Sequence, residues 1–162
     1  MEDIFKQEYY KSLTPEDVSI VINNTTKRNV KKDEIIFEEG VEGNEAYIIQ
    51  SGLVRIYKKV SATDQIVTLA VLKQGMIFGE MAVFEGIPRY AYAAALADSE
   101  LLVLTKKKFQ EIKNNSPIHA LAIVNVFMKF LGLYLRRTTD RVYGIYDTKH
   151  PSSGIEESWE AH

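Results

Sequence analysis

GMIFGEMAVFEGIPRYA, residues 75–91, is the most informative segment of the chain. Gly79 permits a left-handed backbone conformation or the close approach of a ligand. The residues from Glu80 to Val83 can form one helical turn, and the free N–H groups of such a turn would face an anion. Arg89 lies nine residues after Glu80 and opens a run of small and apolar residues. An arginine at the start of a buried strand needs an acceptor, and its planar guanidinium suits a phosphate or a carboxylate.

Two interpretations of this segment are open on spacing alone. In the first, Arg89 forms an ion pair with Glu80 or Glu85, and the loop is only structural. In the second, Arg89 and the amides of residues 79–82 hold a phosphate, while Glu80 accepts a hydrogen bond from a sugar hydroxyl. The two interpretations differ in whether a neighbouring acid already satisfies the guanidinium.

Working outward, the region from about 28 to 104 contains many short segments rich in Ile, Val, Tyr and Leu, separated by turn signals. Six of the nine glycines of the chain lie in this region. Such spacing predicts a mainly β fold, a sandwich or a roll. The candidate strands are 34–37, 46–50, 53–59, 65–72, 92–96 and 100–104.

Helices are predicted on both sides of the strand region. Thr14 and Pro15 form a helix start, with Thr14 as the N-cap and Pro15 at the first helical position. Residues 106–115 predict a short helix, and residues 118–140 predict a longer helix with apolar side chains on two faces. Because one roll can bury only one side of that helix, its other side is expected to pack on a two-fold mate.

Composition narrows the classes of function. The 162 residues carry a net charge of −2 and no cysteine, which argues against a strongly basic nucleic-acid binder and excludes thiol or cysteine-held metal chemistry. The three histidines, His119, His150 and His162, lie outside the strand region, so we expect no metal site and no catalytic residues. The apolar stretch 118–135 is about as long as a membrane span. It contains His119, Asn125 and Lys129 and is expected to be a buried or dimer-forming helix, not a membrane segment.

These motifs resemble the phosphate-binding cassette of cyclic nucleotide-binding domains, a Phe-Gly-Glu-x-Ala start followed by a Pro-Arg-x-Ala strand. Residues 78–82 and 88–91 match this pattern, and Ala95 matches the alanine that usually ends it. Glu39-Gly40 with Gly43, and the strand pair at 46–54, are also similar to the family.

The resemblance implies a cyclic nucleotide-binding β-roll, jelly-roll-like, with short N-terminal helices and a long C-terminal helix. We therefore expect one domain over residues 1–140 and a polar, flexible tail over 141–162. Within the domain, the expected parts are a helical cap (1–27), the β-roll (28–104) and the C-terminal helices (105–140). Trp159 in the tail is expected to be idle.

The resemblance also implies roles for single residues. Arg89 would meet the exocyclic phosphate oxygens, the amides around Gly79 and Ala82 would cap the same phosphate, and Glu80 would bind the ribose 2′-hydroxyl. The amide of Tyr90 would add a phosphate contact. The ligand-binding residues expected on this basis are Phe78, Gly79, Glu80, Met81, Ala82, Pro88, Arg89, Tyr90, Ala91 and Tyr134.

The chain departs from the family pattern where the base would be recognised. Tyr90 stands where a small residue is usual, and Tyr92 stands where Thr or Ser is common. Either ring could stack on a base, or Tyr90 could fill the space that the nucleotide needs. Tyr134 and Leu135 stand where bacterial activators offer a Thr/Ser pair to adenine. Tyr134 keeps a hydroxyl group at its position, whereas Leu135 does not. Phosphate and ribose recognition are expected, and cyclic AMP is placed ahead of cyclic GMP as the ligand.

The predicted function is a cytoplasmic, non-catalytic sensor that binds a cyclic nucleotide and signals through its C-terminal helix. A homodimer through residues 118–140 is expected, with a further protein partner left unnamed. One alternative is a ligand-free dimeric interaction scaffold with a degenerate pocket. Another is the sensor fragment of a transcription regulator. About 20 residues follow the long helix, too few for a helix-turn-helix module, so no direct DNA binding is expected.

Overall fold

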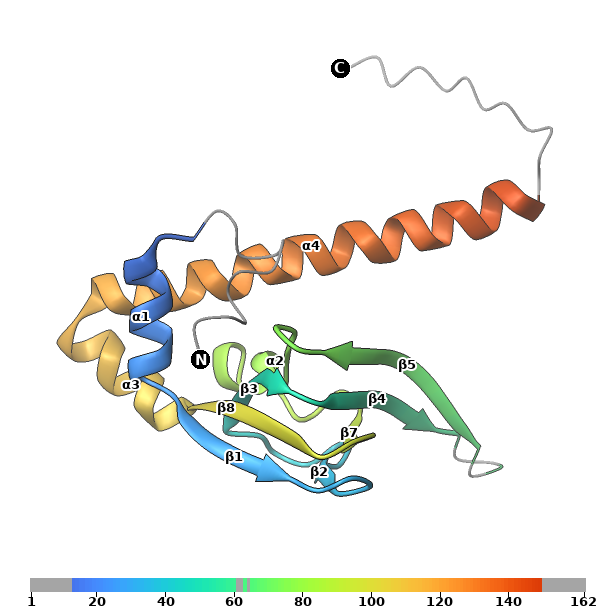
Figure 1. Ribbon diagram of the computed structural model, residues 1–162, viewed down its shortest axis with the longest axis horizontal. Coiled ribbons are helices and arrows are strands. Elements are labelled where there is room, and N and C mark those ends of the chain that lie inside the picture. The colour runs from blue at the N-terminus through green and yellow to red at the C-terminus, as the bar shows by residue number, and fades with distance from the viewer. Residues whose placement is uncertain (1–12, 61–62, 64, 150–162) are drawn as a thin grey trace, which may run out of the picture. The chain divides into compact units, whose positions relative to one another are not determined.

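The computed structural model describes residues 13–60, 63 and 65–149 (Figure 1). The chain divides into two units, Met1–Phe130 and Leu131–His162. All of the described strands belong to the first unit, and the described part of the second unit is helical.

Eight strands form two antiparallel sheets of four, which confirms the mainly β fold. Sheet A has the order β1-β8-β3-β6, and its strands are β1 (Thr26–Val30), β8 (Ser99–Thr105), β3 (Glu45–Ser51) and β6 (Ile77–Phe78). Sheet B has the order β2-β7-β4-β5, and its strands are β2 (Ile35–Phe37), β7 (Tyr92–Ala95), β4 (Leu53–Lys59) and β5 (Ile66–Lys73).

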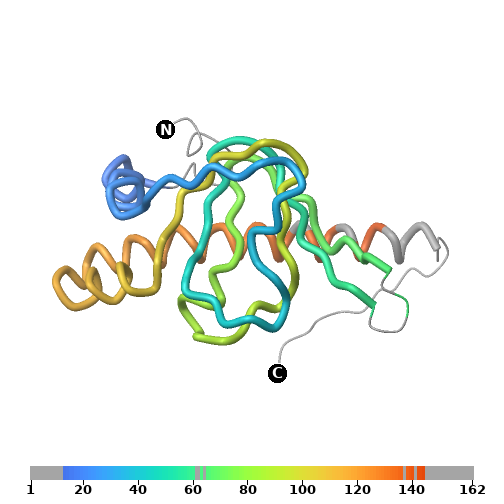
Figure 2. The backbone as a smooth tube through the Cα atoms, turned by 90° about the horizontal axis from the view of Figure 1, so that it is seen from below, coloured from blue at the N-terminus to red at the C-terminus, as the bar shows by residue number. Residues whose placement is uncertain are grey.

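The hydrophobic core lies between the two sheets, whose strands wind around a common interior in Figure 2. Alternate residues of each strand point into this core. The central strands β3 and β8 are also buried on their other face, where Ile48 and Leu102 lie. The buried members of this core are Val30, Ile36, Tyr47, Ile49, Val54, Leu72, Phe78, Ala93, Ala95, Leu101 and Val103.

The helices begin where the sequence predicts. In α1 (Pro15–Asn23), the Thr14 hydroxyl accepts a hydrogen bond from the Asp17 amide at 3.1 Å, and the Asp17 carboxylate accepts one from the Thr14 amide, also at 3.1 Å. These reciprocal bonds satisfy two amides that would otherwise be free. Phe109 and Ile112 are the buried residues of α3 (Lys106–Asn115), as expected.

The structure differs from the predicted elements in two strands, β1 and β6, which lie outside the candidate ranges, and in the end of the last helix. β1 was not predicted, because four of its five residues are polar and only Val30 is buried. The last helix, α4, runs from Pro117 to Lys149, beyond the expected end at 140. Proline disfavours a helical conformation of the residue before it, and Pro151 is the first proline after Pro117. Residues 141–149 are therefore helical and not part of a tail, whereas Trp159 lies outside the described residues.

The first part of α4 behaves as a core helix. Its inward side chains in the first unit are buried, namely Ala120, Ala122, Ile123, Val126, Phe127 and Phe130. By length and composition alone, the segment Pro117–Gly144 could also cross a membrane.

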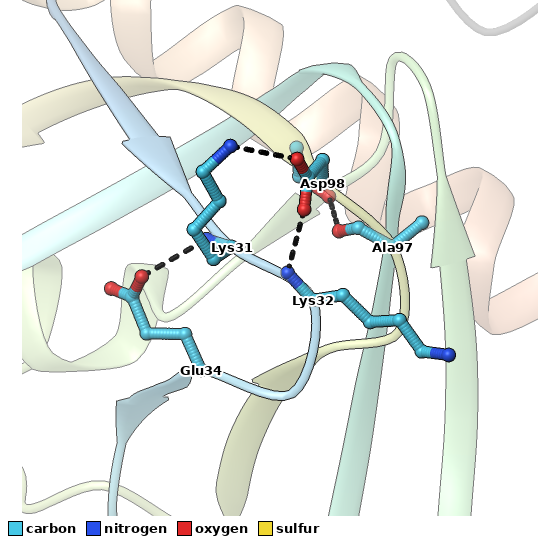
Figure 3. A network of polar contacts seen from close by, with 6 residues as sticks. Lys31, Lys32, Glu34, Ala97 and Asp98 are labelled. Carbon is cyan, nitrogen blue, oxygen red and sulfur yellow. Dashed lines mark hydrogen bonds and ion pairs between the residues drawn. The ribbon is translucent and has the colours of Figure 1, made fainter.

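A polar network ties the turn between β1 and β2 to the start of β8 (Figure 3). The carboxylate of Asp98 accepts bonds from the Lys31 ammonium at 2.8 Å and from the Lys32 amide at 2.9 Å. Glu34 accepts from the Lys31 amide at 3.0 Å and from the Arg28 guanidinium at 3.2 Å. Each acid of the network therefore has both a cation and a backbone donor.

Candidate functional site

The site begins where β6 ends and α2 (Glu80–Phe84) starts. Gly79 links the two elements with a φ of 75°, a left-handed conformation that glycine adopts without strain. No side chain caps α2, and the backbone N–H groups of its first turn have no hydrogen-bond acceptor in the backbone of the described residues. The predicted helical turn is therefore present, with N–H groups that meet no backbone acceptor; the Glu80 amide interacts with the carboxylate of its own side chain.

Arg89 is buried beside this turn, with 6% of its surface exposed. Its Nη1 donates a hydrogen bond to the carbonyl oxygen of Gly79 at 2.7 Å. The backbone of Arg89 is held on both sides, because its carbonyl accepts from the Gly40 amide and its amide donates to the Val41 carbonyl, each at 2.8 Å. The side chain is therefore held in one place, against Gly79, the residue just before α2.

The guanidinium of Arg89 lies against aromatic rings instead of carboxylates. Its Cζ atom is 4.1 Å from the ring centroid of Phe37 and 5.7 Å from that of Tyr47. Nε is buried and has no hydrogen-bond partner among the described residues. A buried polar atom without a partner is costly, and it is rare in native proteins unless an ion or ligand satisfies it.

Neither acid of the structural interpretation pairs with Arg89. Within the described residues, no ion pair joins Arg89 to Glu80 or Glu85. Burial lowers the pKa of Arg89, and electrostatic interactions with Tyr47, Glu45 and Glu80 only partly offset this effect. Burial likewise raises the pKa of Glu80, against the opposing effects of its own amide and of Arg89. The ion pair on which the structural interpretation rests is therefore absent from the described residues.

Two glycines make room for the guanidinium. A Cβ atom on Gly43 would lie 2.6 Å from the Cβ of Ala82 and 2.6 Å from the Cζ of Arg89. A Cβ atom on Gly79 would lie 2.6 Å from Nη1 of Arg89. Both distances are shorter than heavy atoms tolerate, so larger residues at either position would displace Arg89 or α2.

An aromatic wall supports the same side chain. The Tyr47 ring stacks on Phe78 at a centroid distance of 4.9 Å and on Phe37 at 6.0 Å. The Tyr47 hydroxyl donates to the Glu45 carboxylate at 2.6 Å, and burial raises the pKa of this tyrosine. Tyr47 therefore stays neutral at physiological pH and presents its ring face to the cation.

The remaining predicted residues divide between interior and surface. Phe78, Ala82 and Ala91 are buried, whereas Met81 and Pro88 are exposed. Glu80 is partly buried at the first position of α2. The structure thus brings Gly79, Glu80, Ala82 and Arg89 together, as the sequence predicted.

Tyr90 does not plug the space beside Arg89. Its side chain is 65% exposed, and the Lys58 ammonium lies 4.0 Å from its ring centroid. Lys58 is held there by Glu39 at 2.8 Å. Tyr92 stacks on Tyr57 instead, at a centroid distance of 5.1 Å.

Tyr134 lies on α4 in the second unit, so its predicted contact with a base stays a prediction. Phe37 and Tyr47, whose rings lie beside Arg89, were not predicted from the sequence. No local pattern marks them, because both residues also fit an ordinary β core. The Gly40-x-x-Gly43 spacing was noticed as a turn, but its function of leaving room for Arg89 depends on the fold.

Comparison with known proteins gives the same assignment to this part of the chain. A family model described as "Cyclic nucleotide-binding domain" matches residues 27–116. The anaerobic regulatory protein of Bacillus subtilis is 31% identical over 143 residues, which are 82% of this chain and 58% of that protein. The cyclic AMP receptor protein of Thermus thermophilus is 32% identical over 111 residues, which are 68% of this chain and 51% of that protein.

Solved structures agree with the fold. The Thermus thermophilus catabolite activator protein has a TM-score of 0.67 and 26% identity, covering 86% of this chain and 63% of that one. The chain spans about half the length of the curated relatives it matches.

Proposed function

Because this chain belongs to the cyclic nucleotide-binding domain family, we propose that it is a cytoplasmic, non-catalytic sensor whose ligand phosphate binds between Arg89 and α2. The observation that carries the proposal is a buried guanidinium with an unpartnered Nε and no carboxylate within ion-pair distance among the described residues. A phosphate supplies both the missing charge and the missing acceptor.

The neighbouring groups support a cyclic nucleotide over a simple anion. The free amides of the first turn of α2 face the same phosphate, and Glu80 at the head of that helix accepts from the ribose 2′-hydroxyl. The raised pKa of Glu80 indicates a desolvated carboxyl, which gains a hydrogen bond when a hydroxyl approaches. The Tyr90 amide also makes no hydrogen bond among the described residues and adds a donor for the phosphate.

The choice of nucleotide base rests on fewer observations than the phosphate site. We place cyclic AMP ahead of cyclic GMP, with Tyr134 as the base contact, and one relative is named a cyclic AMP receptor protein. Because the Tyr90 ring is exposed, it leaves the nucleotide site free.

Signalling is proposed to pass through α4 and a two-fold mate. Large apolar side chains remain exposed along this helix, with Ile118, Leu121 and Met128 in the first unit and Leu135 and Val142 in the second. Burying them against a second copy removes this apolar surface from water. Nucleotide binding changes the packing of α4 only if the two arrangements differ in nucleotide affinity.

The proposal is tested by titrating the protein with cyclic AMP and cyclic GMP in a calorimeter and by thermal unfolding. We expect Arg89→Gln to weaken nucleotide binding by roughly ten- to a hundredfold, because it removes a charge-assisted hydrogen bond. Arg28→Gln is the matched control, since Arg28 is partly exposed and pairs with Glu34 away from the site. It should leave the affinity unchanged.

Two outcomes contradict the proposal. Equal affinity in the Arg89→Gln variant and the parent protein would remove the assigned phosphate site. The absence of any thermal shift with either nucleotide at millimolar concentration would favour the ligand-free dimeric scaffold, because a ligand at about 100 times its Kd stabilises a fold by roughly 2.7 kcal/mol.

A further inference from the structure

Strand β5 is an open sheet edge without the usual protection. Of the four edge strands, β2 has three residues and β6 has two, while β1 carries Lys27 and Arg28. β5 has eight residues, and its sequence IVTLAVLK has a single charge at its end. Short length, charged side chains and bulges keep sheet edges from pairing with other chains. β5 has only a bulge near Leu69 and the charge of Lys73 at its end.

The register of β4 and β5 shows which side chains share the outer face of this hairpin. Directly opposite residues lie on one face, and Val54 and Leu72 mark the inner face because both are in the core. The outer face therefore carries Leu53, Arg55, Tyr57, Lys59, Ile66, Thr68, Val71 and Lys73. Ring contacts agree, since Arg55 lies 4.7 Å from the Tyr57 ring centroid.

This outer face is cationic, and none of the eight residues named on it is acidic. Arg55, Lys59 and Lys73 form no ion pair with any described residue, whereas Lys58 on the inner face pairs with Glu39. Lys59 lies 4.8 Å from the Tyr92 ring centroid, a contact that leaves its charge uncompensated. The four strands of sheet B contain no Asp or Glu, although the whole chain has a net charge of −2.

Aliphatic side chains lie exposed between the cations. Ile66 and Val71 are each 49% exposed, and Ile35, two strands away from β4 on the same face, is 48% exposed. β-Branched residues beside a free strand edge are the surface that an added strand packs against.

From these observations we propose that β5 binds an extended, acidic segment of a partner protein, which adds to sheet B as a further strand. The partner backbone pairs with the free edge of β5, and its acidic side chains meet Lys73 on β5. Arg55 and Lys59 stand one strand inward on β4, with the Lys59 ammonium over Tyr92 of β7, and add positive charge to the same face. A second copy of this chain is a poorer occupant, because its own β5, IVTLAVLK, carries no acidic residue to meet these cations. This site is separate from Arg89 and does not depend on nucleotide binding.

The probe is a labelled eight-residue peptide of alternating glutamate and valine, titrated against the full chain and followed by fluorescence anisotropy. We expect saturable binding that Lys59→Glu/Lys73→Glu weakens by about tenfold or more. The matched control is Lys107→Glu/Lys113→Glu, which makes the same charge change at exposed positions of α3 and should alter affinity by less than about twofold. Thermal unfolding checks that both variants fold.

Backbone pairing is tested with the same peptide N-methylated at alternate residues, which keeps its charge but removes the amides that a strand edge requires. We expect the methylated peptide not to bind, and the parent peptide to slow amide hydrogen exchange within residues 66–73. Arg89→Gln should leave peptide binding unchanged, so a failure here is distinguishable from a failure of the nucleotide site.

Three outcomes overturn the proposal. Equal binding of the methylated peptide shows that only charge acts. Equal weakening by the two lysine pairs shows that the site is not on this hairpin. Binding of vesicles containing 30% phosphatidylserine, without binding of the peptide, shows that the face meets a lipid surface instead.

Discussion

Arg89 and the cations of the β1–β2 turn are held in opposite ways within the same unit. Lys31 and Arg28 each meet a carboxylate of the network in Figure 3 and lie at the surface. Arg89 is buried, meets two aromatic rings and one carbonyl, and has an unpartnered Nε. The protein itself satisfies the cations of the turn, whereas the buried guanidinium short of acceptors is the observation on which the proposed phosphate site rests.

The largest expected effect is a loss of stability when alanine replaces the glycine beside Arg89 (Gly43) or the glycine beside the Asp98 network (Gly52). Gly43→Ala places a Cβ atom 2.6 Å from Ala82 and Arg89, and Gly52→Ala places one 2.6 Å from the Asp98 carbonyl at a φ of +96°. Each should lower the free energy of unfolding by about 1–3 kcal/mol, measured by urea denaturation. Only Gly43→Ala should also weaken cyclic nucleotide binding. Equal loss of affinity in both variants would erase the distinction between the two regions.

Replacing Arg89 or Arg28 by methionine is expected to change the stability of the free protein by a smaller amount, with opposite sign in the two regions. Arg89→Met should raise the stability of the free protein by about 1 kcal/mol, because it replaces a buried charge without an acid by an apolar side chain of similar length. Arg28→Met should lower stability slightly, since Glu34 loses its partner. Thermal unfolding without ligand measures both. A clear loss of stability in Arg89→Met would show that the guanidinium serves the fold.

The smallest expected effect concerns the free energy of unfolding, whose dependence on pH has opposite signs for the acids of the two regions. Hydrogen bonds from Lys31 lower the pKa values of Glu34 and Asp98, while burial raises the pKa of Glu80. Glu34 and Asp98 therefore stabilise the fold fully above about pH 4 and lose that contribution as the pH falls through their lowered native values. Glu80 opposes folding once it ionises in the unfolded chain, above about pH 4.3.

Urea denaturation between pH 3 and pH 7 measures this difference. Glu34→Gln/Asp98→Asn should flatten the fall in stability at acid pH, and Glu80→Gln should raise stability at pH 7. An acid limb that stays unchanged in the double variant would show that the surface network adds nothing to the fold.

Most of the fold could be predicted because its signals are local. Six strands lie within one residue of the predicted bounds, and the Thr14 cap and the turn after Gly79 are where the sequence places them. β1 escaped prediction because an edge strand with one buried residue has no apolar alternation. The end of α4 escaped because polar residues 141–149 look like a tail unless the position of Pro151 is weighed.

The residues of the site were predictable, but their environment was not. The spacing of residues along the chain identified Gly79, Glu80 and Arg89. It left open whether the guanidinium of Arg89 pairs with a neighbouring acid or with a phosphate. It could not show that Tyr90 turns outward onto Lys58, because the partners of that contact are 32 positions apart in the chain.

Strand alternation, helix caps and glycine turns depend on near neighbours, so the order of residues was enough to establish a β-roll and an arginine in need of an acceptor. Phe37, Gly43, Tyr47 and Gly79 surround that arginine from separate segments, and only the pairing of the strands brings them to one guanidinium. That no carboxylate reaches Arg89 among the described residues, and that β5 is left as an open edge beside unpaired cations, are consequences of long-range packing. Packing of this kind sets which charges meet, and no short pattern in the chain encodes it.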